Sequence, residues 1–339
     1  MEEVNIKLYD ITKCGYFKNR SKELEFCDLP TMLSQVVNWH SGKPLRLTST
    51  FDPPVDTSIL KAYFVDIKKA DSGNYFFTIW NEVPSGDKNA IAALDGTSNI
   101  SSLNIQFRDF GRNYIPGFAT YFWILPSDSI LATIRFNRSY NGHQNFKFLM
   151  KGFLQNNPNY TQTEKRRDEG AIIITGYKTE DGGIAFPSFE TYSRKKSGPI
   201  SYIRSHIGNV STMLGRSLLV EGNPEGLSTY NRFLKLMGVT TEKQLADEKV
   251  KIEYKIPCSL SEHDFNEIYS KWTESDSELN DVGFKIGNDI VWLSHEIQKT
   301  SINMNVTKIN DEVYDLESIR SVIESQRESI LNECSRETG

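Results

Sequence analysis

Residues 60–80, LKAYFVDIKKADSGNYFFTIW, decide the fold of this chain. Residues 60–67 and 75–80 are rich in Tyr, Phe, Val and Ile, and residues 70–74 between them are Ala, Asp, Ser, Gly and Asn, most of which are typical turn residues. Aromatic and β-branched side chains suit a pleated, half-buried surface. The stretch therefore predicts an antiparallel β-hairpin.

The same pattern recurs on both sides of this hairpin. Two more pairs of apolar runs are each joined by turn residues: 118–125 with 130–136, and 282–286 with 290–293. Apolar side chains at helical spacing predict three helices. One begins at Pro30, the second covers residues 144–154 and the third covers residues 312–332. Antiparallel hairpins covered by helices belong to the α+β class.

Length and one polar break predict two domains. The chain has 339 residues, which is longer than one typical domain. Asn156-Asn157-Pro158-Asn159 is a polar, proline-containing break after which the apolar pattern starts again. We expect an N-terminal α+β domain over residues 1–158 and a C-terminal α+β domain, with the terminal helix, over residues 159–339.

Cysteine use and the N-terminus indicate the compartment. The 4 cysteines form no C-x-x-C pair, and no histidine lies near one at zinc-finger spacing. The sequence begins Met1-Glu2-Glu3 without the basic and apolar regions of a signal peptide, and no run approaches the roughly 18 apolar residues that span a bilayer. We expect a cytoplasmic protein with reduced thiols and no cofactor.

Charge is distributed unevenly along the chain. The formal net charge is -5, yet the span from Arg108 to Arg216 holds 15 Lys and Arg against 8 Asp and Glu. Attraction to a phosphate backbone depends on local positive potential rather than on net charge. The span therefore predicts binding to the backbone of double-stranded DNA. The alternative is that its cations are scattered over a solvated surface or paired with the acidic remainder.

The cations of this span fall into clusters at a strand end, on a helix and in loops. The candidate DNA-binding residues are Arg135, Arg138, Lys147, Lys151, Lys165, Arg166, Arg167, Arg194, Lys195, Lys196, Arg204 and Arg216. Lys147 and Lys151 are four residues apart, and therefore share one face of the predicted helix. Contacts of this kind position a protein on the DNA backbone and carry no base specificity.

Two patterns point towards an enzyme. Residues 222–229, GNPEGLST, follow a predicted strand and precede a predicted helix, as a phosphate-binding loop does, but they lack its lysine and its glycine spacing. Glu253 and Lys255 form the acid-x-Lys pair of metal-dependent nucleases, although any alternating charged strand produces it. We expect no catalytic activity, with a magnesium-dependent nuclease as the alternative.

The predicted terminal helix carries an apolar stripe. Its members are Val313, Leu316, Ile319, Ile323 and Ile330. Such a stripe predicts packing on the helix's own domain, with a dimer seam as the alternative. A third class of function is a protein-interaction module whose acidic C-terminal region binds a partner while the basic span pairs with it internally.

Several segments carry a family resemblance. They are residues 115–118 with the hairpin up to Arg135-Phe136, FLKLMG at 233–238, KVKIEYK at 249–255, the hairpin after it and the closing helix at 319–331. In order and spacing these segments resemble RexA, the cytoplasmic member of the Rex phage-exclusion pair. The resemblance implies a two-domain α+β homodimer, similar in fold to the RdgC proteins, that binds DNA without sequence preference. It also implies a non-enzymatic sensor in antiviral defence whose partner is a small membrane channel protein.

Overall fold

A computed structural model of the chain divides it into two units. Unit 1 comprises Met1–Tyr192 with Lys299–Leu331, and unit 2 comprises Ser193–Gln298 with Asn332–Gly339. The structure describes residues 1–18, 23–53, 61–83, 92–97, 105–106, 113–136, 142–157, 159–165, 172–177, 183–196, 199–219, 250–275, 280–310 and 313–336. Both units combine helices with mostly antiparallel sheets, which confirms the α+β class.

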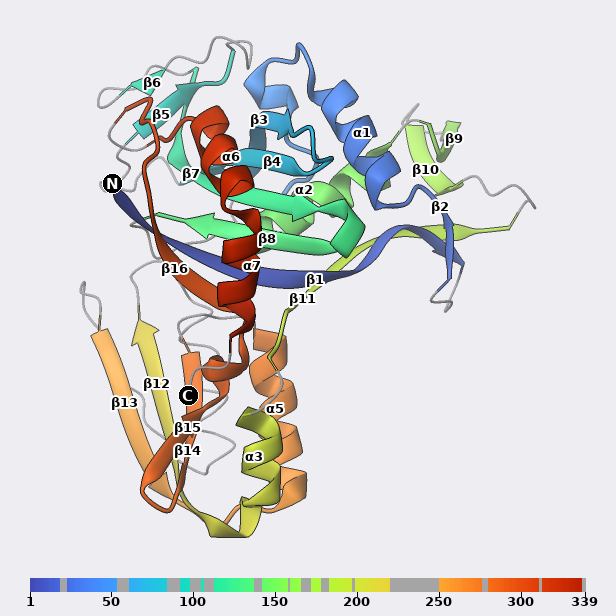
Figure 1. Cartoon of the computed structure of the whole chain (residues 1–339). Helices are drawn as coiled ribbons and strands as arrows, with labels where there is room; N and C mark the ends of the chain where they lie inside the picture. The colour runs from blue at the N-terminus through green and yellow to red at the C-terminus, as the bar shows by residue number, and fades with distance from the viewer. Residues whose placement is uncertain are drawn as a thin grey trace. The chain divides into compact units, whose positions relative to one another are not determined.

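The large sheet of unit 1 has the strand order β11-β1-β8-β7-β4-β3 (Figure 1). These strands are β1 (Glu2–Lys18), β3 (Ala62–Lys69), β4 (Tyr75–Glu82), β7 (Tyr114–Leu125), β8 (Ile130–Arg135) and β11 (Ala185–Ser193). Shorter strands pair outside this path: β2 (Leu24–Phe26) and β16 (Lys299–Met304) with β1, β5 (Ala92–Asp95) with β7, and β6 (Ile105–Gln106) with β5. The β3–β4 and β7–β8 pairs are antiparallel, so both predicted hairpins are confirmed.

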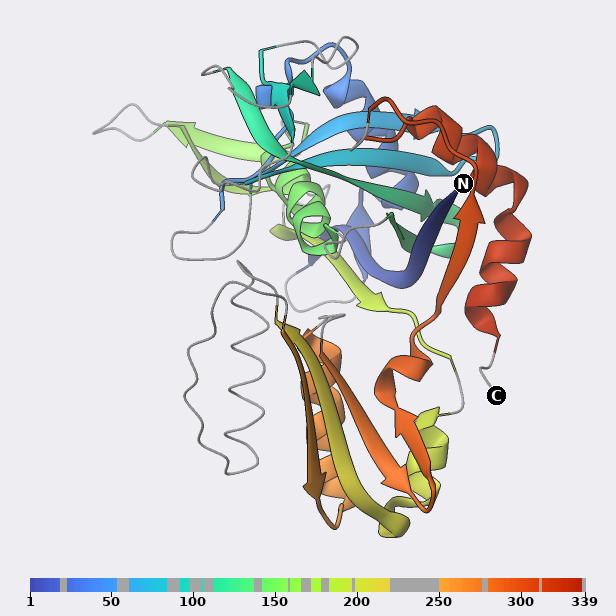
Figure 2. The same cartoon turned by 90° about the vertical axis from the view of Figure 1, so that its left-hand side faces the viewer.

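Helices cover both faces of this sheet. The helices α1 (Leu29–His40) and α2 (His143–Asn156) pack on one face, where Phe146 of α2 stacks on Phe122 of β7 at 4.3 Å between ring centroids. The helix α6 (Leu316–Ser325) lies on the opposite face, in front of the sheet in Figure 1 and beside it in Figure 2. Alternation along each strand supplies apolar side chains to both layers.

The terminal helix of the sequence prediction is two helices in the structure. The first, α6, ends before Gln326, and α7 (Arg327–Ser335) follows it. The Asp315 side chain caps the N-terminus of α6 by accepting a hydrogen bond from the Ser318 backbone N–H at 2.8 Å. The residues of the predicted apolar stripe are all buried, so the stripe packs within the protein.

The division between the units lies after β11 and not at the polar break. Asn157 ends α2 with its amide bonded to Gln35 Oε1 at 2.7 Å and its Oδ1 accepting from the Asn159 backbone N–H at 3.1 Å. The break is therefore a helix terminus, and the chain continues in unit 1. The next hairpin, β9 (Thr161–Lys165) with β10 (Ile172–Tyr177), places Tyr177 against Tyr16 of β1, with ring centroids 5.2 Å apart.

Unit 2 is a four-stranded antiparallel sheet covered on one face by two helices. Its strands run in the order β13 (Val250–Pro257), β12 (Val210–Leu219), β14 (Asn280–Ile286) and β15 (Asp289–Trp292), and its helices are α3 (Pro199–Ser205) and α5 (Glu262–Ser275). Phe265 of α5 meets Phe284 of β14 edge to face, at 5.6 Å between ring centroids. The β14–β15 pair confirms the third predicted hairpin. Short 3₁₀ turns complete the fold: η1 (Leu45–Leu47), η3 (Pro126–Asp128), η4 (Ile207–Asn209) and η5 (Leu293–Glu296).

A buried histidine makes the stability of unit 1 depend on pH. Burial lowers the pKa of His40 from 6.5 to about 4, Lys43 adds to the effect, and the hydrogen bond between His40 Nε2 and the Phe64 carbonyl oxygen opposes it. The unfolded chain therefore takes up a proton as the pH falls below 6.5, and the folded chain does not. We expect the free energy of unfolding to fall by about 2 kcal/mol between pH 7 and pH 5.

The His40→Gln variant isolates this effect. Glutamine retains a donor for the Phe64 carbonyl and does not titrate, so the variant should lose much less stability over the same pH range. Urea unfolding of both proteins at several pH values measures the difference. Parallel pH profiles would show that His40 does not cause the loss.

Candidate nucleic-acid interface

The outer face of α2 presents two of the predicted cations. Phe146, Leu149 and Phe153 of this helix are buried against the sheet, so Lys147 and Lys151 fall on the side away from it. Lys151 is exposed and Lys147 is partly exposed. Within the described ranges neither ammonium group makes a hydrogen bond or an ion pair. Both are therefore available to an anion.

The carboxylate of Glu190 on β11 affects the charge near the outer face of α2. Burial by itself would raise the pKa of Glu190 on β11, but hydrogen bonds from Lys13 and Ser188 and the charges of Lys13 and Lys147 bring it below its usual value. Lys13 lies 3.1 Å from the Glu190 carboxylate and pairs with it directly. Two lysines therefore act on the ionised Glu190 carboxylate, and Lys151 adds a further positive charge on the outer face of α2.

Arg135 lies elsewhere in the same sheet. It is the last residue of β8 and is opposite Asn5 of β1. Its side chain is partly buried. Lys165 ends β9, at the tip of a separate two-stranded sheet. Arg138, Arg166 and Arg167 lie outside the described residues, as does the side chain of Lys165.

Lys195 of unit 2 is part of the internal structure of that unit. Its ammonium group donates to Tyr269 Oη at 2.5 Å and to Thr273 Oγ1 at 3.2 Å, and it lies 4.2 Å from the centroid of the Tyr269 ring. Burial lowers the pKa of Lys195, and the charge of Glu296 opposes this shift. The side chain ties the segment after β11 to α5, so it is not presented to a ligand.

Arg216 is also committed to its own unit. Its guanidinium group pairs with Asp281 at 2.8 Å and lies 4.0 Å from the centroid of the Trp292 ring. In the sheet, Arg216 lies between Asp281 of β14 and Glu253 of β13. Two neighbouring carboxylates therefore offset its charge.

The other predicted cations of unit 2 differ in exposure. Lys196 donates to the Arg336 carbonyl oxygen at 2.6 Å, and the Arg194 carbonyl oxygen accepts from the Gln298 backbone N–H at 2.8 Å. Arg204 on α3 is exposed and donates to Asn266 Oδ1 at 2.9 Å. Among the candidate DNA-binding residues of unit 2, Arg204 is exposed, and Arg194, Lys195, Lys196 and Arg216 are partly buried.

The features predicted for an enzyme are not assembled into a site. Glu253 and Lys255 are exposed on β13, on the face of the sheet that α3 and α5 leave uncovered. Across the part of the chain that the structure describes, no three His, Cys, Asp or Glu side chains gather as metal ligands. The glycine-containing segment 222–229 lies outside the described residues.

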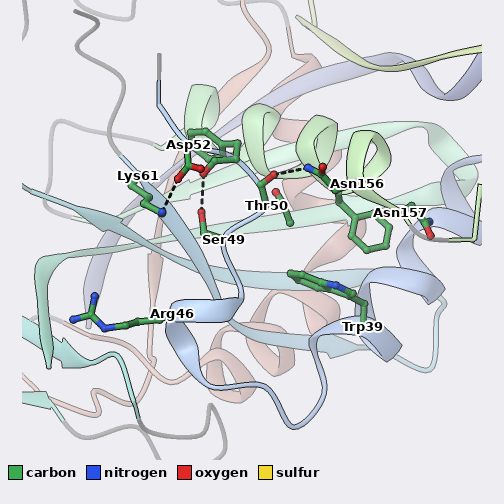
Figure 3. A pocket seen from close by; sticks show the side chains of 10 residues that line it. Trp39, Arg46, Ser49, Thr50, Asp52, Lys61, Asn156 and Asn157 are labelled. Carbon is green, nitrogen blue, oxygen red and sulfur yellow. Dashed lines mark hydrogen bonds and ion pairs between the residues drawn. The ribbon is translucent and has the colours of Figure 1, made fainter. Parts of the chain in front are cut away.

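Unit 1 contains a pocket of about 330 Å³ that the sequence analysis does not predict (Figure 3). It lies between the end of α1, the segment 46–52, Lys61 and the end of α2. Trp39 and Phe153 line it edge to face, at 5.6 Å between ring centroids. Its lining comes from four separate segments, so no local motif could indicate it.

The polar groups of the pocket divide between its two ends. Figure 3 shows Lys61 and Arg46 at one end and Asn156 and Asn157 at the other. Lys61 Nζ is 2.7 Å from Asp52 Oδ1. Asn156 Nδ2 donates to the Thr50 carbonyl oxygen at 3.1 Å and to the Gly152 carbonyl oxygen at 2.9 Å.

The chain matches no protein-family model and no curated protein sequence. Among the residues that the structure describes, no helix is both long enough and apolar enough to cross a membrane.

Proposed function

We propose that this protein is a non-enzymatic DNA-binding protein that contacts the backbone of double-stranded DNA through the outer face of α2. The observation that carries the proposal is the pair Lys147 and Lys151, which lie one helical turn apart and have no hydrogen-bond or ion-pair partner in the described ranges. Each lysine that neutralises a phosphate releases condensed counterions, and this gives affinity without sequence preference.

The excess of cations between Arg108 and Arg216 supports the same proposal. Lys195 and Arg216 contribute to it least, because internal partners hold their charged groups. Lys147, Lys151 and Arg204 contribute most, because their side chains are partly or fully exposed. The interface in this proposal is therefore smaller than the full set of predicted cations.

The resemblance to RexA extends the proposal to a biological role. It suggests a RexA-like, RdgC-like fold, a homodimer and a sensor of phage exclusion that alters its conformation on DNA and signals to a membrane channel protein. The mixed α+β architecture with two units is compatible with that role. Sedimentation of the protein with and without DNA tests the dimer directly.

Charge reversal on α2 tests the DNA-binding proposal. The double variant Lys147→Glu/Lys151→Glu should bind a 20-base-pair duplex at least about tenfold more weakly in a gel shift at moderate salt, because two phosphate contacts become repulsive. Both side chains point away from the core, so the fold should be retained.

A matched control carries the same change of charge. Lys271→Glu/Lys285→Glu alters two exposed lysines outside the basic span and should leave duplex affinity within about twofold. Equal losses in the two variants would indicate a non-specific effect of net charge and contradict the α2 interface. Reversal of residues 194–196 is less suitable, because Lys195 supports the structure of unit 2.

The nuclease alternative has its own test. Incubation of plasmid DNA with the protein and Mg²⁺ or Mn²⁺ should leave the plasmid intact. Cleavage that disappears in a Glu253→Gln variant would replace the proposal with the metal-dependent nuclease. Binding of a protein partner without any duplex shift would favour the interaction module instead.

A further inference from the structure

The pocket between α1 and α2 has the chemistry of a nucleotide site, and we propose that it binds one nucleotide unit. The ligand is either a free mononucleotide or an unstacked nucleotide of a single strand, because both present the same base, sugar and phosphate. The site is separate from the duplex-binding face of α2. It uses the side of α2 that carries Phe153 and Asn156, and the lysine face lies elsewhere on the helix.

The size of the pocket limits the ligand. Its volume is about 330 Å³. Pockets for small organic ligands range from about 300 to 1,000 Å³. The pocket therefore lies at the lower end of this range, which favours a ligand the size of one nucleotide unit.

The aromatic wall is preorganised for a planar ring. Trp39 meets Phe153 at 5.6 Å and Phe64 at 6.4 Å, both edge to face, so its indole ring is fixed by neighbours on two elements. Stacking of a nucleobase on an aromatic side chain is a main source of affinity for unpaired nucleotides, and it tolerates every base. A ring that is already fixed loses little conformational entropy on binding.

The charged end of the pocket suits a phosphate. Lys61 and Arg46 line this end, and Arg46 Nη2 donates to the Asn113 carbonyl oxygen at 3.1 Å. The Lys43 ammonium group is not part of the lining and lies over the Trp39 ring, 3.5 Å from its centroid. Asp52 is the carboxylate of the lining, and its side chain is 88% exposed. An ion pair this open to water contributes little, so a phosphate can replace Asp52 as the partner of Lys61.

The amide end of the pocket favours a base with an amino group. Asn156 Nδ2 donates to two backbone carbonyl oxygens, which fixes the orientation of the amide. Its Oδ1 accepts no hydrogen bond from any residue in the described ranges and can therefore accept one from a base. Adenine, cytosine and guanine carry an exocyclic amino group, and thymine does not. We expect the pocket to prefer dAMP to dTMP.

Three substitutions separate the contributions to binding. Lys61→Gln should weaken dAMP binding about tenfold and leave deoxyadenosine binding unchanged, since it removes a charge that only the phosphate uses. Asp52→Asn should strengthen dAMP binding several-fold, because it removes the competing carboxylate. Trp39→Leu should weaken the binding of both ligands by about tenfold or more. Lys69→Gln, at the far end of β3 from Lys61, is the control and should change neither.

Isothermal titration with dAMP, dTMP, deoxyadenosine and inorganic phosphate measures these effects. The proposal is overturned by an absence of dAMP binding at millimolar concentration, by equal binding of inorganic phosphate and dAMP, or by opposite or absent effects at Lys61 and Asp52. Lys61 and Asp52 are surface side chains, so their variants remain informative even if Trp39→Leu fails to fold.

A second titration identifies the source of the nucleotide. A short oligo-dA that binds more tightly than dAMP, and displaces it, indicates a single strand as the ligand. An oligonucleotide that does not displace dAMP indicates a free mononucleotide. Lys147→Glu/Lys151→Glu should leave dAMP binding unchanged and Lys61→Gln should leave duplex binding unchanged, so each proposal can fail without the other.

Discussion

Replacement of Phe146 by alanine is expected to lower the free energy of unfolding by about 3–5 kcal/mol. The Phe146 side chain is 0% exposed, stacks on Phe122 at 4.3 Å and meets Phe77 edge to face at 5.4 Å between ring centroids. Its loss leaves a cavity between α2 and the sheet that the rigid strands β4 and β7 cannot close. Urea unfolding followed by circular dichroism measures the change.

Phe186 provides the matched control. It is a phenylalanine of the same unit, but 48% of it is exposed on β11. Phe186→Ala should change the free energy of unfolding by less than about 0.5 kcal/mol. A loss below about 1 kcal/mol for Phe146→Ala would contradict the packing of α2 on the sheet, and with it the orientation of the lysine face.

Replacement of Asp281 by alanine is the second large effect, with an expected loss of about 3 kcal/mol from the stability of unit 2. Asp281 is 7% exposed. Its carboxylate accepts hydrogen bonds from Arg216 Nη2 at 2.8 Å, from Ser294 Oγ at 2.5 Å and from the Ser294 backbone N–H at 2.9 Å. The substitution leaves the donors of β12 and of the turn after β15 without an acceptor.

The reciprocal variant Arg216→Met should lose less, about 1 kcal/mol. The Asp281 carboxylate then keeps its Ser294 donors, and the Arg216 side chain is already 38% exposed. The double variant should lose less than the sum of the two single variants, because the two residues contact each other. Strict additivity in denaturant titrations would contradict the ion pair. We also expect Arg216→Met to leave duplex affinity unchanged.

Local patterns predict most elements of the fold. The runs at 60–67 and 75–80 become β3 and β4, and the turn residues between them fall where expected. The apolar spacing at 144–154 becomes α2. These elements are predictable because their signals, alternation and helical spacing, lie within one segment.

Pairing between distant segments is not predictable in this way. The strands β11 and β16 both join β1, although β16 lies about 300 residues later in the chain. Neither segment has a strong apolar run: β16 reads KTSINM, and its side chains are largely exposed or half-buried. These strands are placed by the open edge of the long strand β1. For this reason the division between the units follows β11 and not the polar break at 156–159.

Prediction of the candidate site from the sequence is limited in the same way. Charge counting identifies Lys147 and Lys151, which are open to solvent to different degrees. It identifies Lys195 and Arg216 equally, because composition does not show that Tyr269 and Asp281 hold their charged groups. The pocket at Trp39 depends on contacts between four segments. The sequence signal that could have indicated it, cations close to an aromatic residue at Lys43 and Arg46, is too common to be specific.

The salt dependence of duplex binding tests the central claim most directly. For the unaltered protein, the logarithm of the association constant should fall linearly with the logarithm of salt concentration, by about 0.9 for each phosphate contacted, and equally for two unrelated duplex sequences. Neutralising α2 in Lys147→Gln/Lys151→Gln should reduce the slope by about two. Duplex binding that is absent at low salt, insensitive to salt, or unchanged in slope by this variant would contradict the account.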